Sequence, residues 1–231
     1  MPGRLAIYDD EIFKKDIQNI FENIQDTISI LKPKYNIAPT IEIPIFLNNK
    51  VYTYAHFGLI PSWAKDKKTM NINGRSETLF EKSSFRESFK NKRCLIPING
   101  YYEWKKDLET KQSIPYHIHP IKENYFALAG LWDEWYDSDT NMYILSCALI
   151  TTEPNNTIAK LHDRMPVILD KKDWKLWLDE TSSLKDLNKL FKPCDSSVTH
   201  IKKVSTLVNN VKNDNIECIV ESKVMEQRTL F

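Results

Sequence analysis

Glycine is scarce in this sequence, and several other features are missing as well. Only five of the 231 residues are glycine, against a typical share of about 7%, which disfavours folds built on many glycine turns. No apolar run approaches the roughly 20 residues of a membrane-spanning helix, and no signal peptide begins the chain. The 32 basic and 31 acidic residues nearly cancel, so contact with nucleic acid requires a local basic patch.

Paired cysteines and familiar catalytic signatures are also absent. The cysteines, Cys94, Cys147, Cys194 and Cys218, lie far apart and form no C-x-x-C motif. This spacing argues against a zinc site and is typical of a reducing compartment, so we expect a cytoplasmic protein. His117 and His119 could point to one face of a strand, but without a third ligand nearby we interpret them as surface histidines. Nucleotide-binding loops and the motifs of serine hydrolases and zinc proteases are missing too.

The hydrophobic pattern predicts one domain of mixed structure. Apolar residues recur at helical spacing over 11–31, and two extended runs around the turn at 48–50 predict a β-hairpin within 35–57. Further strands are expected at 94–98, 101–104, 116–118, 125–131, 142–151, 198–204 and 216–220, and shorter helices at 78–90, 154–161, 174–178 and 184–191. Because these elements lack a regular βαβ rhythm, we expect an α+β fold around a largely antiparallel sheet.

Glu103 and His162 are titratable residues that lie next to aromatic or apolar residues in the sequence. Glu103 lies in the stretch Tyr-Tyr-Glu-Trp, where burial among aromatic rings would raise its pKa and suit it to acid–base chemistry. The alternative is a strand residue that points outward between inward ones. His162 follows an apolar segment and precedes a proline turn, and it is either a reactive imidazole or a capping or core histidine.

Arginine is used sparingly. Six of the 32 basic residues are arginine, which suggests positions where a planar, bidentate guanidinium matters. Arg75 and Arg164 fall within polar clusters, and Arg4 lies beside the N-terminus. Each of these arginines could contact a phosphate or pair with a buried carboxylate, and both alternatives remain open.

Six ordered motifs resemble those of the SRAP (SOS response-associated peptidase) family. They are Met1 to Arg4, Asn36 to Pro39, Phe57 to Trp63, Asn73 to Thr78, Gly100 to Trp104 and His162 to Pro166. The late loop at 208–213 also fits, so the resemblance covers nearly the whole chain. Phe57 and Gly74 stand where the family has tryptophan and alanine, and both are mild changes.

The resemblance implies a fold and a chemistry. It implies one SRAP-like domain over 1–224, a curved, barrel-like sheet with flanking helices, and no metal or organic cofactor. It also implies roles in the SOS response and in DNA repair, through recognition of abasic sites in single-stranded DNA and a covalent crosslink made by residue 2 after Met1 is removed. Asn73 would orient the nucleophile, Glu103 would act as acid and base, and His162 would act on the sugar oxygen. The implied DNA contacts are Gly3, Arg4, Asn36, Pro39, Trp63, Arg75 and Thr151.

Residue 2 is the main departure from the family pattern. The family has cysteine there, and this chain has Pro2, so the thiazolidine ring of the family crosslink cannot form. Three interpretations remain open: an introduced substitution in a competent protein, a natural member that binds DNA without crosslinking, and a protein that reacts through the secondary amine of a freed proline. Lyase, hydrolase or peptidase activity is thus undecided, although no constellation for general proteolysis is visible.

The end of the chain carries a separate motif. Gln227, Leu230 and Phe231 form a Gln-x-x-Leu-Phe pattern in a tail at 225–231, similar to the segments by which bacterial repair proteins dock on the sliding clamp. The two apolar side chains would fill a pocket on the clamp, with the glutamine at its rim. The alternative is that they pack back on the domain.

Overall fold

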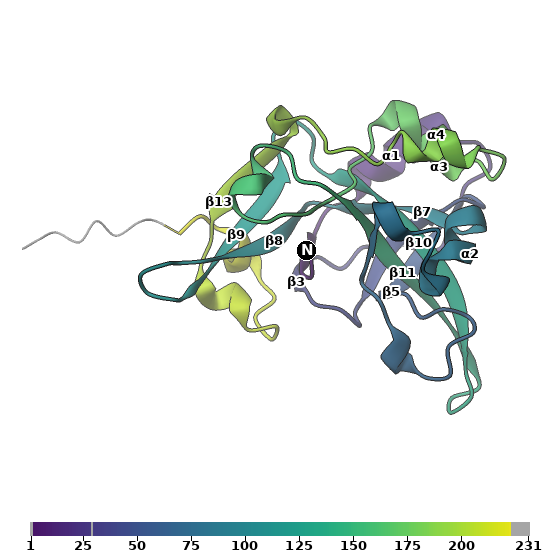
Figure 1. The fold of residues 1–231 in the computed structure, drawn as a ribbon, viewed down its shortest axis with the longest axis horizontal. Coiled ribbons are helices and arrows are strands. Elements are labelled where there is room, and N and C mark those ends of the chain that lie inside the picture. Colours follow the sequence, from purple (N-terminus) through teal and green to yellow (C-terminus); the bar gives the residue numbers. More distant parts are fainter. Residues whose placement is uncertain (1, 29, 223–231) are drawn as a thin grey trace, which may run out of the picture.

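The centre of the fold is a small closed barrel. The computed structural model describes residues 2–28 and 30–222. The barrel strands are β4 (Glu42–Leu47), β5 (Val51–Phe57), β7 (Arg93–Ile98), β10 (Phe126–Asp137) and β11 (Met142–Thr152). They pair antiparallel in the order β11-β10-β7-β4-β5, and β5 then pairs in parallel with β11, which closes the ring (Figure 1). The predicted barrel-like, largely antiparallel sheet is therefore confirmed.

Short strands extend the barrel at its edges. β2 (Gln25–Asp26) pairs in parallel with β5, β6 (Asn73–Arg75) pairs in parallel with β11, and β12 (Met165–Pro166) pairs antiparallel with β11. β11 is thus the strand on which distant parts of the sequence meet.

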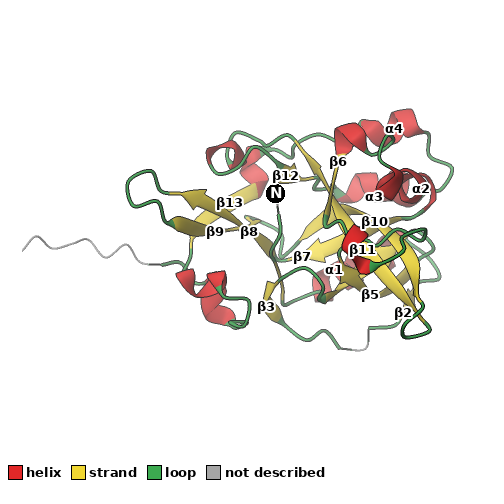
Figure 2. Ribbon diagram, turned by 60° about the horizontal axis from the view of Figure 1, so that its bottom comes forward, coloured by secondary structure: helices red, strands yellow, loops and turns green. Residues whose placement is uncertain are grey.

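A second, open sheet lies beside the barrel. Its antiparallel strands follow the order β13 (Thr199–Lys203), β9 (Ser113–Pro120), β8 (Gly100–Lys106), β1 (Leu5–Ile7) and β3 (Lys34–Ile37). In Figure 2, β8, β9 and β13 extend away from the barrel. β7 and β8 are separated by Asn99 alone, and a Cβ atom at Gly100 would lie 2.8 Å from the backbone oxygen of Ile118. Only glycine therefore allows the chain to cross between the sheets so closely.

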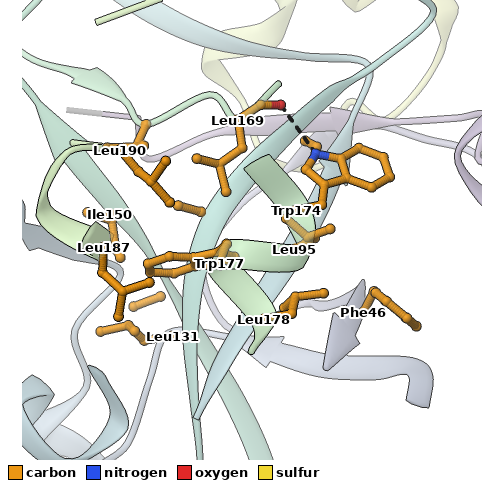
Figure 3. Packing of buried hydrophobic residues seen from close by; sticks show 14 of the residues in the cluster. Phe46, Leu95, Leu131, Ile150, Leu169, Trp174, Trp177, Leu178, Leu187 and Leu190 are labelled. Atoms are coloured by element: carbon orange, nitrogen blue, oxygen red, sulfur yellow. Dashed lines mark hydrogen bonds between the residues drawn. The ribbon is translucent and has the colours of Figure 1, made fainter. Parts of the chain in front are cut away.

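The helices cover one face of the barrel wall. They are α1 (Glu11–Ile20), α2 (Ser83–Asn91), α3 (Trp174–Leu178) and α4 (Leu184–Asn188). Alternate residues of β7 enter two different cores: Leu95 faces the helices with Trp174 and Trp177 (Figure 3), whereas Ile96 faces the core shared with the second sheet. The barrel is therefore held from both sides by apolar contacts.

Arg93 is a fully buried structural arginine. Its guanidinium donates hydrogen bonds to the carbonyl oxygens of Phe89, Lys90, Trp177 and Asp179, at 2.6–2.8 Å. It thereby satisfies the open carbonyls at the end of α2 and joins that helix to α3.

Two predicted elements are wrong. The helix expected over 11–31 ends at Ile20, because Asn23 adopts a left-handed backbone (φ 57°) and the chain then joins β5 as the short strand β2. Ile28 still reaches the core, but from extended backbone. The strand expected at 216–220 is a 3-10 turn over Ile216–Ile219, which begins where the side chain of Asn215 accepts a hydrogen bond from the amide of Glu217.

The expectation that His117 lies on the surface is also wrong. β9 pairs with strands on both sides, and His117 is 1% exposed and lies against the ring of Tyr102. Burial lowers the pKa of His117 well below its usual value, so the ring is neutral. The predicted tail motif, Gln227, Leu230 and Phe231, lies outside the described residues.

Candidate active site and nucleic-acid interface

The second residue is held inside the protein. Pro2 is buried, and its carbonyl oxygen accepts a hydrogen bond of 3.0 Å from the amide nitrogen Nδ2 of Asn73. Asn73 begins β6, where it lies opposite Leu149 of β11. A Cβ atom at Gly74 would lie 2.8 Å from a methyl carbon of buried Leu79, so an alanine there would require that side chain to shift. The hydrogen bond between Asn73 and Pro2 thus joins the motif at 73–78 to the N-terminal segment.

β-pairing brings Glu103 to the same place. Leu5 lies opposite Tyr101, and the amide of Tyr102 donates to the carbonyl of Arg4 at 3.0 Å. Continuing this antiparallel register places Gly3 opposite Glu103. Glu103 is 4% exposed, and burial raises its pKa, while the electrostatic interaction with His162 lowers it. The burial and raised pKa expected for Glu103 are confirmed.

The Nδ1 atom of His162 lies close to two polar groups. It lies beyond the 3-10 turn Ile158–Lys160, with Nδ1 at 3.0 Å from the amide nitrogen of Arg164 and 2.8 Å from Oδ1 of Asp163. A neutral Nδ1 accepts from the amide, and a protonated Nδ1 donates to the carboxylate. In the neutral form the proton is on Nε2, which can donate to a ligand.

Arg164 connects the His162 loop to β6 and β11. Its guanidinium donates to both carboxylate oxygens of Glu77 (2.6 and 2.9 Å) and to the carbonyl oxygen of Thr151 (2.6 Å). The hydrogen bond from Arg164 is the largest cause of the lowered pKa of Glu77. Of the alternatives left open for Arg164, the structure supports the carboxylate pair, although Glu77 is half-exposed. This arrangement fixes the segments that carry Asn73 and His162 relative to each other.

Arg75, the arginine of β6, is exposed. Arg75 lies directly opposite Thr151 in the pairing of β6 with β11. Its guanidinium has no hydrogen bond or ion pair within the described part of the chain. Trp63 is 55% exposed, and its indole nitrogen donates to the carbonyl of Ser83 at 3.3 Å. Pro39 is half-buried and lines a groove of about 280 Å³ with Val211. These side chains remain accessible to a ligand, whereas Thr151 is fully buried.

Arg4 and Asn36 have partners inside the protein. Arg4 Nη1 donates to Asn36 Oδ1 (2.6 Å) and to the carbonyl of Val208 (2.9 Å), and its guanidinium lies over the ring of Trp104. The amide nitrogen of Asn36 lies within 3.1 Å of three carbonyl oxygens, those of Val208, Asn210 and Asn213. Sequence reasoning assigned both residues to DNA and missed this role, for which the family-like loop at 208–213 was the available signal.

The cysteines do not replace the missing thiol at residue 2. Cys94, Cys147 and Cys218 are buried in apolar cores. Cys194 is half-buried, and burial raises its pKa to about 11, so little thiolate exists at neutral pH. Within residues 2–28 and 30–222, no cluster of three or more histidine, cysteine, aspartate or glutamate side chains could hold a metal ion. No helix in this same part of the chain is long and apolar enough to cross a membrane.

Comparison with known proteins agrees with this geometry. The chain is 42% identical over 193 residues to the abasic site processing protein YoqW of Bacillus subtilis, covering 81% of this chain and 85% of the relative. It is 38% identical over 228 residues to YoaM of the same organism, another abasic site processing protein, covering 95% and 97% of the two chains. It is 32% identical to the abasic site processing protein HMCES of Xenopus tropicalis, covering 81% of this chain and 66% of that protein.

Solved structures share the fold of this chain, and a family sequence model matches most of it. A crystal structure of a Bacteroides thetaiotaomicron protein superposes with a TM-score of 0.83 at 26% identity, covering 96% of this chain and 100% of that one. A Bordetella bronchiseptica protein shares the fold, with a TM-score of 0.70 at 18% identity over 89% of this chain and 100% of that one. The model of the SOS response associated peptidase (SRAP) family matches residues 1–211. The chain therefore belongs to the SRAP family.

Proposed function

We propose that this protein recognises abasic sites in single-stranded DNA and that residue 2 lies at the reaction centre. The main observation in support of this proposal is the hydrogen bond from Asn73 to the carbonyl of Pro2, which lies beside buried Glu103. The names of the relatives, abasic site processing proteins, support the same substrate. Exposed Arg75 and Trp63 supply a cation for phosphate and a ring for a base.

The proposed reaction begins at the amine of residue 2, once Met1 has been removed. The nitrogen attacks the aldehyde carbon of the open-chain sugar, and water leaves as the iminium forms. As the sugar ring opens, protonated His162 donates its Nε2 proton to the ring oxygen, and the imidazole takes up the proton that the C1′ hydroxyl loses as the aldehyde forms. Glu103 accepts the proton that the amine loses on attack and returns it to the carbinolamine hydroxyl, which leaves as water; its raised pKa suits that exchange near neutral pH.

Pro2 stops this sequence at the iminium. In a chain with cysteine at residue 2, the thiol adds to the iminium carbon, loses its proton and closes a stable five-membered ring. Proline has no thiol, so its iminium either returns to aldehyde by hydrolysis or loses a sugar proton and eliminates the 3′ phosphate. A freed Pro2 would therefore give lyase chemistry, and a retained Met1 would leave an amide nitrogen that cannot attack.

The second candidate function is a binding module without covalent chemistry. The specific observation in its favour is Pro2 itself. Recognition of DNA through Arg75, Trp63 and Pro39 does not require a nucleophile. The two candidates differ in whether borohydride traps the protein on abasic DNA.

The test compares the protein with a Pro2→Cys variant on single-stranded DNA that contains one abasic site. Intact mass first establishes whether Met1 is present on each protein. We expect a heat-stable shifted band on a denaturing gel for Pro2→Cys and none for the Pro2 form, with Pro2→Ala as the matched control without a thiol. A heat-stable band from the Pro2 form would contradict the proposal. A folded, Met1-free Pro2→Cys protein without a band would show that the surrounding site is inactive.

A further inference from the structure

A cross-strand row on the second sheet begins at Glu103. In the antiparallel register of β8 and β9, Glu103 lies opposite Tyr116, and in that of β9 and β13, Tyr116 lies opposite Lys203. Residues directly opposite each other on neighbouring strands share a face of the sheet. Tyr116 and Lys203 therefore lie on the same face as Glu103, about 5 and 10 Å away at the strand spacing of roughly 4.8 Å.

A second lysine lies on that face. Lys105 follows Glu103 by two residues and so points to the same side of β8, opposite Ile114. Both Lys105 and Lys203 are exposed, and Tyr116 is half-buried between Glu103 and Lys203. On the opposite face, Tyr102 and Trp104 pack against Val204 and Val208.

The lysines of this face are not neutralised by a close ion pair. Asp107 interacts electrostatically with Lys203. Its Oδ1, however, accepts hydrogen bonds from the amides of Glu109 and Thr110 and from the hydroxyl of Thr110, which hold its own turn together. Neither Lys105 nor Lys203 has an ion pair within 4 Å among the described residues. The face therefore offers two available cations and one aromatic ring next to the candidate reaction centre.

We propose that Tyr116, Lys105 and Lys203 form a platform that binds the single strand where it leaves the abasic site. One base stacks on Tyr116, and the two lysines contact the flanking phosphates. The proposal rests on the proposed function, because the strand enters the platform from the sugar held at Glu103. Stacking on an aromatic ring beside a cationic track is the general means of holding single strands without reading their sequence. Figures 1 and 2 show that β8, β9 and β13 continue beyond the barrel, which gives the strand a surface to follow.

The test measures binding of fluorescent single strands that carry a tetrahydrofuran abasic analogue. The probes are a long strand with flanks on both sides and two shortened strands, each lacking the flank on one side. The variants are Tyr116→Ala, Tyr116→Phe, Lys105→Gln and Lys203→Gln. The matched control is Lys106→Gln, which removes an exposed lysine of the same strand that points to the other face. Thermal unfolding confirms that each variant is folded.

We expect Tyr116→Ala to weaken binding of the long strand by about 5- to 100-fold and Tyr116→Phe to leave it unchanged, because the ring provides the stacking. Each lysine variant should reduce the slope of log affinity against log salt by about 0.7. These losses should disappear with one of the two shortened strands, which identifies the flank on the platform. Lys106→Gln should bind as the original protein does.

The outcomes separate the platform from the function on which it rests. If the original protein binds the long strand and the Tyr116 and lysine variants bind it equally well with unchanged salt slopes, the platform is wrong and the proposed function stands. If the original protein does not bind abasic single strands, both are wrong. An effect of Lys106→Gln as large as that of Lys105→Gln would also contradict the platform, because it would show a general loss of charge.

Discussion

Asn36→Ala tests whether this residue mainly serves DNA or mainly holds the protein together. The side chain is 4% exposed, and its two amide hydrogens are shared among the carbonyls of Val208, Asn210 and Asn213. Its Oδ1 accepts from the guanidinium of Arg4 at 2.6 Å. The alanine variant therefore loses two neutral hydrogen bonds and one with a charged donor.

The expected loss of stability is large for a single side chain. Two neutral bonds at about 1 kcal/mol each and one charge-assisted bond at about 1.5 kcal/mol give about 3–4 kcal/mol. For a domain of this size, 1 kcal/mol corresponds to roughly 2–4 °C, so the Tm should fall by about 6–16 °C. The late loop should detach, and Arg4 should lose its fixed position over Trp104.

The assay is thermal and urea unfolding followed by circular dichroism, with Asn213→Ala as the matched control. The side chain of half-buried Asn213 makes one hydrogen bond, of 2.8 Å, to the carbonyl of Leu207, and its loss should cost about 1 kcal/mol or less. A Tm for Asn36→Ala within about 3 °C of the original protein would refute the reasoning. If DNA binding were nevertheless lost, Asn36 would be a direct contact.

Three further predictions concern charge and the tail. Arg75→Ala should weaken binding to abasic single strands and reduce the salt slope by about 0.7, whereas Arg86→Ala, at an exposed position of α2, should not. Equal affinity of the original protein for duplex and single strand would contradict the proposed preference. Burial raises the pKa of Glu103 in the folded protein above its value in the unfolded chain. The stabilisation from its protonated carboxyl group is therefore full below the unfolded pKa and is lost as the pH rises through the folded pKa. Glu103→Gln should therefore raise the Tm at pH 7 and gain nothing at pH 4, and a variant that is less stable at pH 7 would count against this linkage. Deletion of residues 227–231 should abolish binding to the sliding clamp in surface plasmon resonance; unchanged binding, or none by the full chain, would reject the clamp motif.

Local pattern determined much of the fold from the sequence alone. The turn at 48–50 between two extended runs predicted the β4–β5 hairpin, and Lys50 indeed adopts the left-handed backbone that closes such turns (φ 67°). The aromatic neighbours of Glu103 predicted its burial, because alternate positions of a two-sided strand both enter apolar surroundings. Six ordered motifs were enough to indicate the family, and the relatives confirm it.

Where local pattern was ambiguous, tertiary contacts decided the structure. Residues 24–28 carry apolar side chains at helical spacing, but a left-handed Asn23 and pairing with β5 hold them as extended backbone. His117 is polar and was expected at the surface, yet it is buried against the ring of Tyr102, in space left open by Gly100 on the neighbouring strand. Pairing between distant strands competes with local propensity, and no short window of sequence contains the partner strand.

The sequence by itself indicated which residues could take part in the proposed chemistry, namely Pro2 in place of cysteine, Asn73, Glu103 and His162. Only the tertiary structure decided how the two arginines of the central motifs are used. Arg164 binds Glu77 and Thr151, whereas Arg75 on the neighbouring strand is exposed. The two residues are alike in sequence, and the difference arises because β6 and the His162 loop meet on β11, where one guanidinium turns inward to a carboxylate and the other outward to solvent.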